Sequence, residues 1–229
     1  MNFPTPKLNE FLDSSKSIPG ILSVFGDFGV GKTTLALQIA INTTNEGKVI
    51  FVYSKPNFPY EKVGKILSNK SSHILNNIIF IFALNFVDLN SIVFNLELLI
   101  LHFLKENKTP IKLIVIDSIT DLYRLELNRD KKEKNFRLNY QLNQILAILY
   151  YINDTYGTEI LIVNEISRKN EGDATKEVQS GGNVVDYWIK SSIQISRTKK
   201  LNVRRFNIIK DPEMKSFHFL IDLSENGFG

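Results

Sequence analysis

The chain contains no cysteine, so a disulfide framework cannot stabilise it. Its three histidines, His73, His102 and His218, are scattered along the sequence and do not indicate a metal cluster. No apolar run reaches membrane-spanning length, because polar residues interrupt the best candidate, 92–104, which we predict to be a core helix. The N-terminus lacks the pattern of a signal peptide, so we expect a cytoplasmic protein without a membrane partner.

The overall composition is that of a globular protein, with 229 residues, 43% hydrophobic and 23% charged. This length suits one large domain, which we place at 19–229 behind an N-terminal extension, 1–18, with a short helix. The net charge is +4, and the segment 168–215 holds eleven basic and six acidic residues. Such a surplus suits a phosphate backbone, but solvated strands and loops often look the same, so charge alone leaves nucleic-acid binding open.

A glycine-rich stretch near the N-terminus is the most informative motif. An apolar run precedes it and a segment with helical apolar spacing follows, which is the context of a phosphate-binding loop rather than of an ordinary glycine turn. Bare amides and the helix N-terminus would bind phosphates, with Lys32 on the β- and γ-phosphates and the Thr33 hydroxyl on Mg²⁺. The predicted nucleotide-binding residues are Gly26, Asp27, Phe28, Gly29, Val30, Gly31, Lys32, Thr33 and Thr34.

An acidic partner for the magnesium ion should stand at the end of a neighbouring strand. Asp117 closes the apolar run 113–116 and is our candidate, although an Asp in that position can also cap the next helix. Asn164 and Glu165 end the following predicted strand and could position a water or sense the γ-phosphate. The sequence therefore predicts a metal site of Thr33 and Asp117.

Strand and helix patterns alternate up to residue 164, which predicts an α/β fold with a mainly parallel twisted sheet flanked by helices. Three short strand patterns follow and predict antiparallel strands at the C-terminal edge. The segment 167–183, which lies between the alternating part and these three strands, is polar and contains glycine, so we expect no regular structure there. The charged run 128–134 is expected to be a solvated, mobile connection between helices.

Three segments resemble one protein family. The segment 113–129, LIVIDSITDLYRLELNR, is similar to the RecA/RadA recombinases, and within them to the short archaeal RadB group. The segment 49–63, VIFVYSKPNFPYEKV, resembles the second strand and following helix of the same family. Gly181 and Gly182, with the strand 192–197, resemble the end of its second DNA-binding loop and the next strand. The likeness extends from about residue 8 to the end of the chain.

This resemblance implies a RecA-like P-loop NTPase core that binds ATP and Mg²⁺ in homologous recombination and DNA repair. The phosphate loop begins already at Gly26, so the N-terminal DNA-binding domain and linker of the full-length recombinases are expected to be missing. The segment 167–182 would stand in the place of the DNA-binding loops, and 210–212 resembles the segment that covers a neighbour's adenine, although an ordinary turn also explains Asp-Pro. The candidate contacts to single-stranded DNA are Arg168, Lys169, Lys176, Arg204 and Arg205.

Two departures from the family pattern concern hydrolysis. Lys55 stands where the family has the glutamate that activates water, and Glu165 stands where it has a glutamine. A lysine cannot act as a carboxylate base, so we expect firm ATP binding with slow hydrolysis, at most a weak DNA-dependent ATPase. Lys32 and Glu165 are the candidate catalytic residues, since Glu165 could take over as the base.

The expected partners are single-stranded DNA and a RadA-type recombinase or another paralogue, in a homo- or hetero-oligomer. A different reading is an ATP-binding assembly switch without DNA function, similar to KaiC-type proteins. A third is a P-loop ATPase that acts on a small molecule, although no residue pattern identifies such a substrate.

Overall fold

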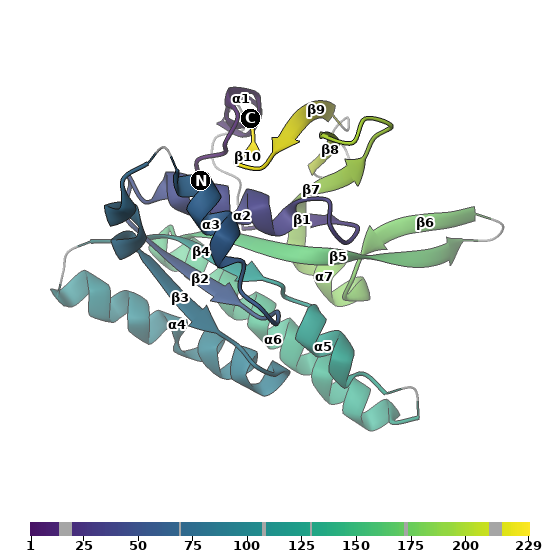
Figure 1. Ribbon diagram of the computed structural model, residues 1–229. Helices are drawn as coiled ribbons and strands as arrows, with labels where there is room; N and C mark the ends of the chain where they lie inside the picture. The colour runs from purple at the N-terminus through teal and green to yellow at the C-terminus, as the bar shows by residue number, and fades with distance from the viewer. Residues whose placement is uncertain (14–19, 69, 107–108, 129, 172–173, 211–216) are drawn as a thin grey trace.

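Six parallel strands form the centre of a ten-stranded sheet. The structure is a computed structural model that describes residues 1–13, 20–68, 70–106, 109–128, 130–171, 174–210 and 217–229 (Figure 1). The sheet order is β10-β9-β8-β7-β1-β5-β4-β2-β3, with β6 paired to β5 outside this path. The parallel strands are β1 (Ile21–Gly26), β2 (Lys48–Tyr53), β3 (Ile78–Phe82), β4 (Ile111–Asp117), β5 (Glu159–Glu171) and β7 (Ile189–Arg197). The antiparallel edge contains β8 (Val203–Lys210), β9 (Phe217–Ser224) and β10 (Gly227–Phe228).

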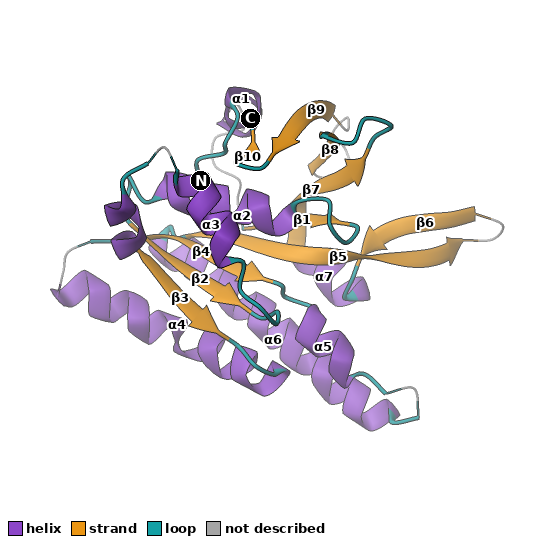
Figure 2. Ribbon diagram, viewed as in Figure 1, coloured by secondary structure: helices purple, strands orange, loops and turns teal. Residues whose placement is uncertain are grey.

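Helices cover both faces of this sheet (Figure 2). One face carries α1 (Pro6–Asp13), α2 (Lys32–Thr43) and α3 (Tyr60–Leu67). The other carries α4 (Phe86–Glu106), α5 (Asp121–Glu126), α6 (Lys132–Tyr156) and α7 (Gly182–Trp188). A 3₁₀ helix, Ser72–Asn77, precedes β3. This arrangement confirms the predicted α/β fold with antiparallel strands at the C-terminal edge.

The central strands are mostly apolar because both of their faces are buried. In β2, Val49 and Phe51 pack into the core beneath α2, whereas Ile50 and Val52 pack into the core beneath α4 and α6. The N-terminal segment joins the first of these cores through Phe3 and Leu8. Residues 14–19 lie outside the described part, so the domain boundary at 18/19 remains a prediction.

Among the described helices, α4 alone has the length and apolar composition that a membrane crossing needs. Its residues Leu89, Val93, Leu96 and Ile100 pack into the core formed with α6, as predicted for the segment 92–104. The core helix of a globular domain passes the same length and composition test. Its outer face nevertheless remains apolar and exposed, which the periodicity did not indicate.

Two expectations about irregular segments were wrong. The segment 167–183 is not irregular, because β5 continues to Glu171 and pairs antiparallel with β6 (Ala174–Gln179), forming the hairpin that projects from the body in Figure 1. Hydrogen bonds of the strand ladder support this hairpin in place of apolar burial, so no alternation of apolar residues marked it. The run 128–134 is not a connection throughout, because α6 begins at Lys132.

Candidate nucleotide-binding site

The turn between β1 and α2 has the conformation that its glycines allow. Gly29 and Gly31 adopt φ values of 75° and 106°, in the left-handed region that favours glycine. A Cβ atom on Gly26 would lie 2.2 Å from the Ile195 carbonyl oxygen, so no other residue fits there. No described side chain caps the first turn of α2, which leaves its amides available to an anion. The turn can therefore hold phosphate oxygens through its backbone.

The ammonium group of Lys32 lies inside this turn. Its Nζ donates to the carbonyl oxygens of Gly26 and Asp27, at 2.7 and 2.8 Å. It also donates to Glu165 Oε2 at 2.8 Å. Burial lowers the pKa of Lys32, and the carboxylate of Glu165 opposes that shift. The predicted phosphate ligand and the predicted water-activating residue are thus in direct contact.

The two predicted magnesium ligands meet beside the turn. Thr33 Oγ1 donates to Asp117 Oδ2 at 2.6 Å, although the two residues are 84 positions apart in the sequence. The carboxylate of Asp117 is completely buried at the end of β4. A hydroxyl and a carboxylate are the oxygen ligands that Mg²⁺ prefers, so these residues fit the ion.

A cavity of about 610 Å³ opens over the loop and is large enough for a nucleotide. Of the predicted binding residues, Phe28, Gly29, Gly31, Lys32, Thr33 and Thr34 line it. Gly26 and Val30 are buried beneath the loop, and Asp27 takes part through its carbonyl oxygen. Residues that the motif did not predict, including Tyr53 and Leu223, complete the walls.

Lys55 enters the site from the end of β2, and its Nζ faces three carboxylates. The distances are 2.9 Å to Asp117 Oδ1, 3.6 Å to Glu165 Oε1 and 3.9 Å to Asp121 Oδ2. Burial disfavours the charged form of Lys55, but the three carboxylates, Asp117 first, outweigh burial and raise its pKa. The side chain is therefore an ammonium ion at neutral pH.

Sequence reasoning did not place three residues at this site, although it named one of them, Arg204, as a candidate DNA contact. Asp121, in the first turn of α5, faces Lys55. Arg197 Nη2 donates to the Phe28 carbonyl oxygen at 2.7 Å, and Arg204 Nε donates to the Val30 carbonyl oxygen at 3.3 Å. The register of β7 and β8 places these arginines directly opposite each other. These contacts depend on which residues of β7 and β8 lie opposite each other, so the basic sequence pattern alone did not distinguish the two arginines from surface residues.

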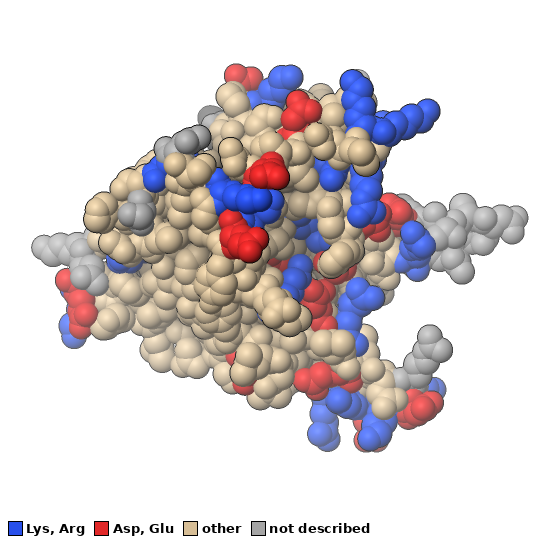
Figure 3. All heavy atoms as spheres, in the orientation of Figure 1, with Lys and Arg blue, Asp and Glu red and all other residues tan. Residues whose placement is uncertain are grey.

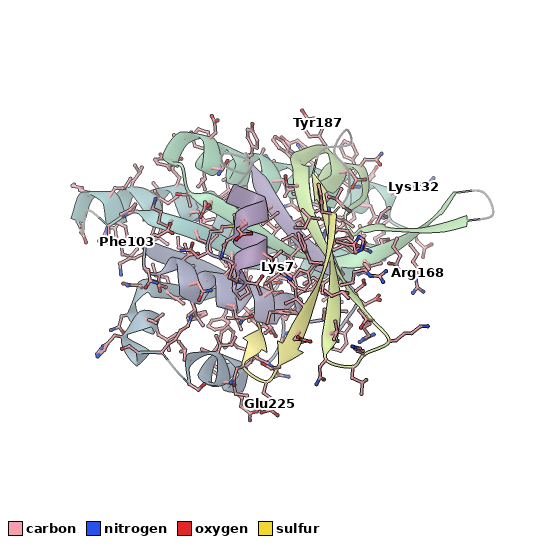
Figure 4. The ribbon with its side chains drawn as sticks, turned by 90° about the horizontal axis from the view of Figure 1, so that it is seen from above. Lys7, Phe103, Lys132, Arg168, Tyr187 and Glu225 are labelled. Carbon is pink, nitrogen blue, oxygen red and sulfur yellow. The ribbon has the colours of Figure 1, made fainter. Side chains whose placement is uncertain are left out.

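The predicted DNA contacts lie in two places. Arg168 is exposed on β5, and Figure 4 shows it at the end of the molecule from which the hairpin projects. Lys169 and Lys176 are opposite each other in the hairpin register. Arg205 is exposed on β8, whereas Arg204 is bound to the phosphate loop. In Figure 3, Lys and Arg side chains gather around the β7–β8 turn and the base of the hairpin, with acidic residues between them.

Hydrogen bonds connect the base of the hairpin to the candidate nucleotide site. The side chain of Glu165 contacts Lys32, while its carbonyl oxygen accepts from the Ser180 amide at 2.9 Å. Asn164 Nδ2 donates to the Ser180 carbonyl oxygen at 2.8 Å, and Thr120 Oγ1 donates to Asn164 Oδ1 at 2.5 Å. Glu165 therefore belongs to both regions. β5 passes through this point and does not end there as predicted.

The segment 210–212, which resembles an adenine-covering segment, lies largely outside the described residues, because 211–216 are not described.

The chain is similar to known recombination proteins along most of its length. A protein-family model described as Rad51 matches residues 5–229. The DNA repair and recombination protein RadB of Methanocaldococcus jannaschii is 33% identical over 195 residues, which cover 83% of this chain and 82% of that protein. RadB of Methanobrevibacter smithii is 27% identical over 199 residues, with 86% and 81% covered. RadB of Methanococcus maripaludis is 29% identical over 217 residues, with 93% and 94% covered.

Proposed function

Because the chain belongs to the Rad51 family, we propose that it is a RadB-like recombinase paralogue that binds ATP, Mg²⁺ and single-stranded DNA. In this role it regulates homologous recombination and DNA repair, in the cytoplasm, together with a RadA-type recombinase or another paralogue. The observation that carries the proposal is that Lys32 and Thr33 line one cavity, where Thr33 Oγ1 is hydrogen-bonded to the buried carboxylate of Asp117.

ATP would lie over the first turn of α2, with Lys32 on its β- and γ-phosphates. Thr33 and Asp117 would hold Mg²⁺, which neutralises phosphate charge when bound. Lys55 lies where a carboxylate would have to accept a proton from water, and an ammonium ion cannot do so. Glu165 is engaged by Lys32 and Lys55, which lowers its availability as a base. These contacts support slow hydrolysis.

Single-stranded DNA would lie along the hairpin and the exposed basic residues of β7 and β8. Arg168 and Arg205 are exposed and free to approach phosphates, whereas Arg204 already serves the phosphate loop. A nucleotide that changes the contact between Lys32 and Glu165 would act on the hairpin through the Glu165 carbonyl oxygen. Nucleotide and DNA binding would then be coupled.

The experiment that tests this function is a titration of labelled single-stranded DNA, with and without ATP, at two salt concentrations. We expect affinity to fall steeply with salt, and Arg205→Glu to weaken binding by roughly fivefold to tenfold while reducing the salt slope. Glu133→Lys, a charge change in the first turn of α6, is the control. A DNA affinity that changes neither with salt nor with Arg205→Glu contradicts the proposal. Nucleotide-dependent oligomers without DNA binding would favour the assembly switch.

A further inference from the structure

The ammonium group of Lys55 lies close to three carboxylates. Asp117, Asp121 and Glu165 come from β4, α5 and β5, and each has an oxygen atom within 3.9 Å of Lys55 Nζ. Such a group of acids attracts a cation, and here the chain supplies that cation itself. The ammonium is largely enclosed, since only 21% of the Lys55 side chain is exposed.

The same ammonium shares Asp117 with the predicted magnesium site. Thr33 donates to Oδ2 of Asp117, whereas Lys55 pairs with Oδ1. If Thr33 and Asp117 held a magnesium ion, the negative charge of this carboxylate would already be partly neutralised by Lys55. The positive charge of Lys55, 2.9 Å from Oδ1, opposes the Coulomb attraction between Asp117 and a metal ion.

The net charge of the site changes with the residue at position 55. Lys32 and Lys55 stand against Asp117, Asp121 and Glu165, so these groups carry one net negative charge. With a carboxylate at position 55 they would carry three. A triphosphate entering without a metal ion meets far less repulsion in the first case than in the second.

We infer that Lys55 is a resident cation that takes over part of the charge neutralisation that Mg²⁺ supplies, so this chain binds ATP with little dependence on Mg²⁺. This inference rests on the proposed ATP binding. It assigns Lys55 a positioning and specificity role in nucleotide binding, distinct from the loss of a catalytic base.

The test compares the dissociation constant of a fluorescent ATP analogue in excess Mg²⁺ with that in EDTA. For the wild-type protein we expect the dissociation constant in EDTA to exceed that in Mg²⁺ by less than about tenfold. The reason is that the interaction of one buried ammonium with the triphosphate can be worth a factor of about ten or more in binding. Lys55→Met should raise the ratio by roughly tenfold to hundredfold over wild type. Lys55→Arg, which keeps the charge, should retain the wild-type ratio.

Lys62→Met is the matched control. Lys62 lines the same cavity, but its Nζ reaches the Glu225 carbonyl oxygen, at 3.4 Å, and not the acidic cluster. Its substitution removes one positive charge from the cavity and should leave the ratio between the two conditions unchanged. Circular dichroism confirms that each variant is folded, and Lys55→Gln replaces Lys55→Met if the methionine variant does not fold.

The inference is overturned if the ratio of the two dissociation constants is the same in wild type and in the folded Lys55→Met or Lys55→Gln variant. It is also overturned if Lys62→Met raises this ratio as much as the neutral variant of Lys55 does. Failure of the proposed function has a different signature, because wild-type protein would then bind no ATP even in excess Mg²⁺.

Discussion

The edge of the sheet that holds the proposed nucleotide site and the β5–β6 hairpin carry their charges in opposite ways. At the edge, Lys32 and Asp117 are buried, and each is paired with groups from distant parts of the chain. On the hairpin, Arg168 is exposed and Lys169 faces Lys176 in the strand register. Buried charges must be paired when the protein folds, whereas exposed ones remain available to a partner. The charges of the edge are therefore already satisfied within the chain, whereas Arg168 can still pair with a group outside it.

Replacing Lys32 should disturb the buried network most. We expect Lys32→Ala to weaken ATP binding by roughly a hundredfold, because it removes a charge-assisted contact to phosphate. It also leaves Glu165 with Lys55 as its remaining cation. Isothermal titration calorimetry with ATP and Mg²⁺ measures the loss, and Lys62→Ala, in the same cavity, should cost far less.

Hydrolysis of ATP, followed in the same preparations, should be slow in the wild-type protein. Turnover typical of an ordinary ATPase that disappears in Lys32→Ala would show that the ammonium of Lys55 does not prevent water activation.

The parallel half of the fold could be predicted from the sequence because its strands are buried on both faces. The apolar run 113–116 predicts a buried strand, and β4 is that strand. The glycine-rich turn predicts a loop that leads into a helix, and that helix is α2. The hairpin could not be predicted, because most of its residues are polar and its support comes from backbone pairing between Ile166–Glu171 and Ala174–Gln179.

The candidate site divides in the same way. The meeting of Thr33 and Asp117 could be predicted, since the carboxyl ends of the parallel strands of one sheet lie at the same edge. The sheet order could not, because β5 lies between β1 and β4, which the sequence analysis expected to be neighbours. The contacts of Arg197 and Arg204 with the phosphate loop could not, because they depend on the register of β7 and β8. Nor could the convergence of three carboxylates on Lys55, which joins four separate elements of the chain.

A pair of valine substitutions tests whether the two regions differ in stability as well as in charge. Val115 is fully buried in β4, whereas Val178 is only partly buried in β6. We expect Val115→Ala to lower the free energy of unfolding by about 2 kcal/mol, through lost burial and a cavity. Val178→Ala should cost less than about 1 kcal/mol. Urea denaturation measures both values, and equal losses would mean that the hairpin is an integral part of the core.

The smallest expected effect concerns two neighbouring arginines that the sequence does not distinguish. Arg204 donates to the Val30 carbonyl oxygen, while Arg205, on the other face of β8, is exposed. Without DNA, Arg204→Gln should weaken ATP binding by roughly fivefold, the equivalent of one hydrogen bond of about 1 kcal/mol that holds the loop. Arg205→Gln should leave ATP binding unchanged and weaken DNA binding instead. If both variants affect the same ligand equally, β8 does not divide its basic residues between the buried site and the exposed surface.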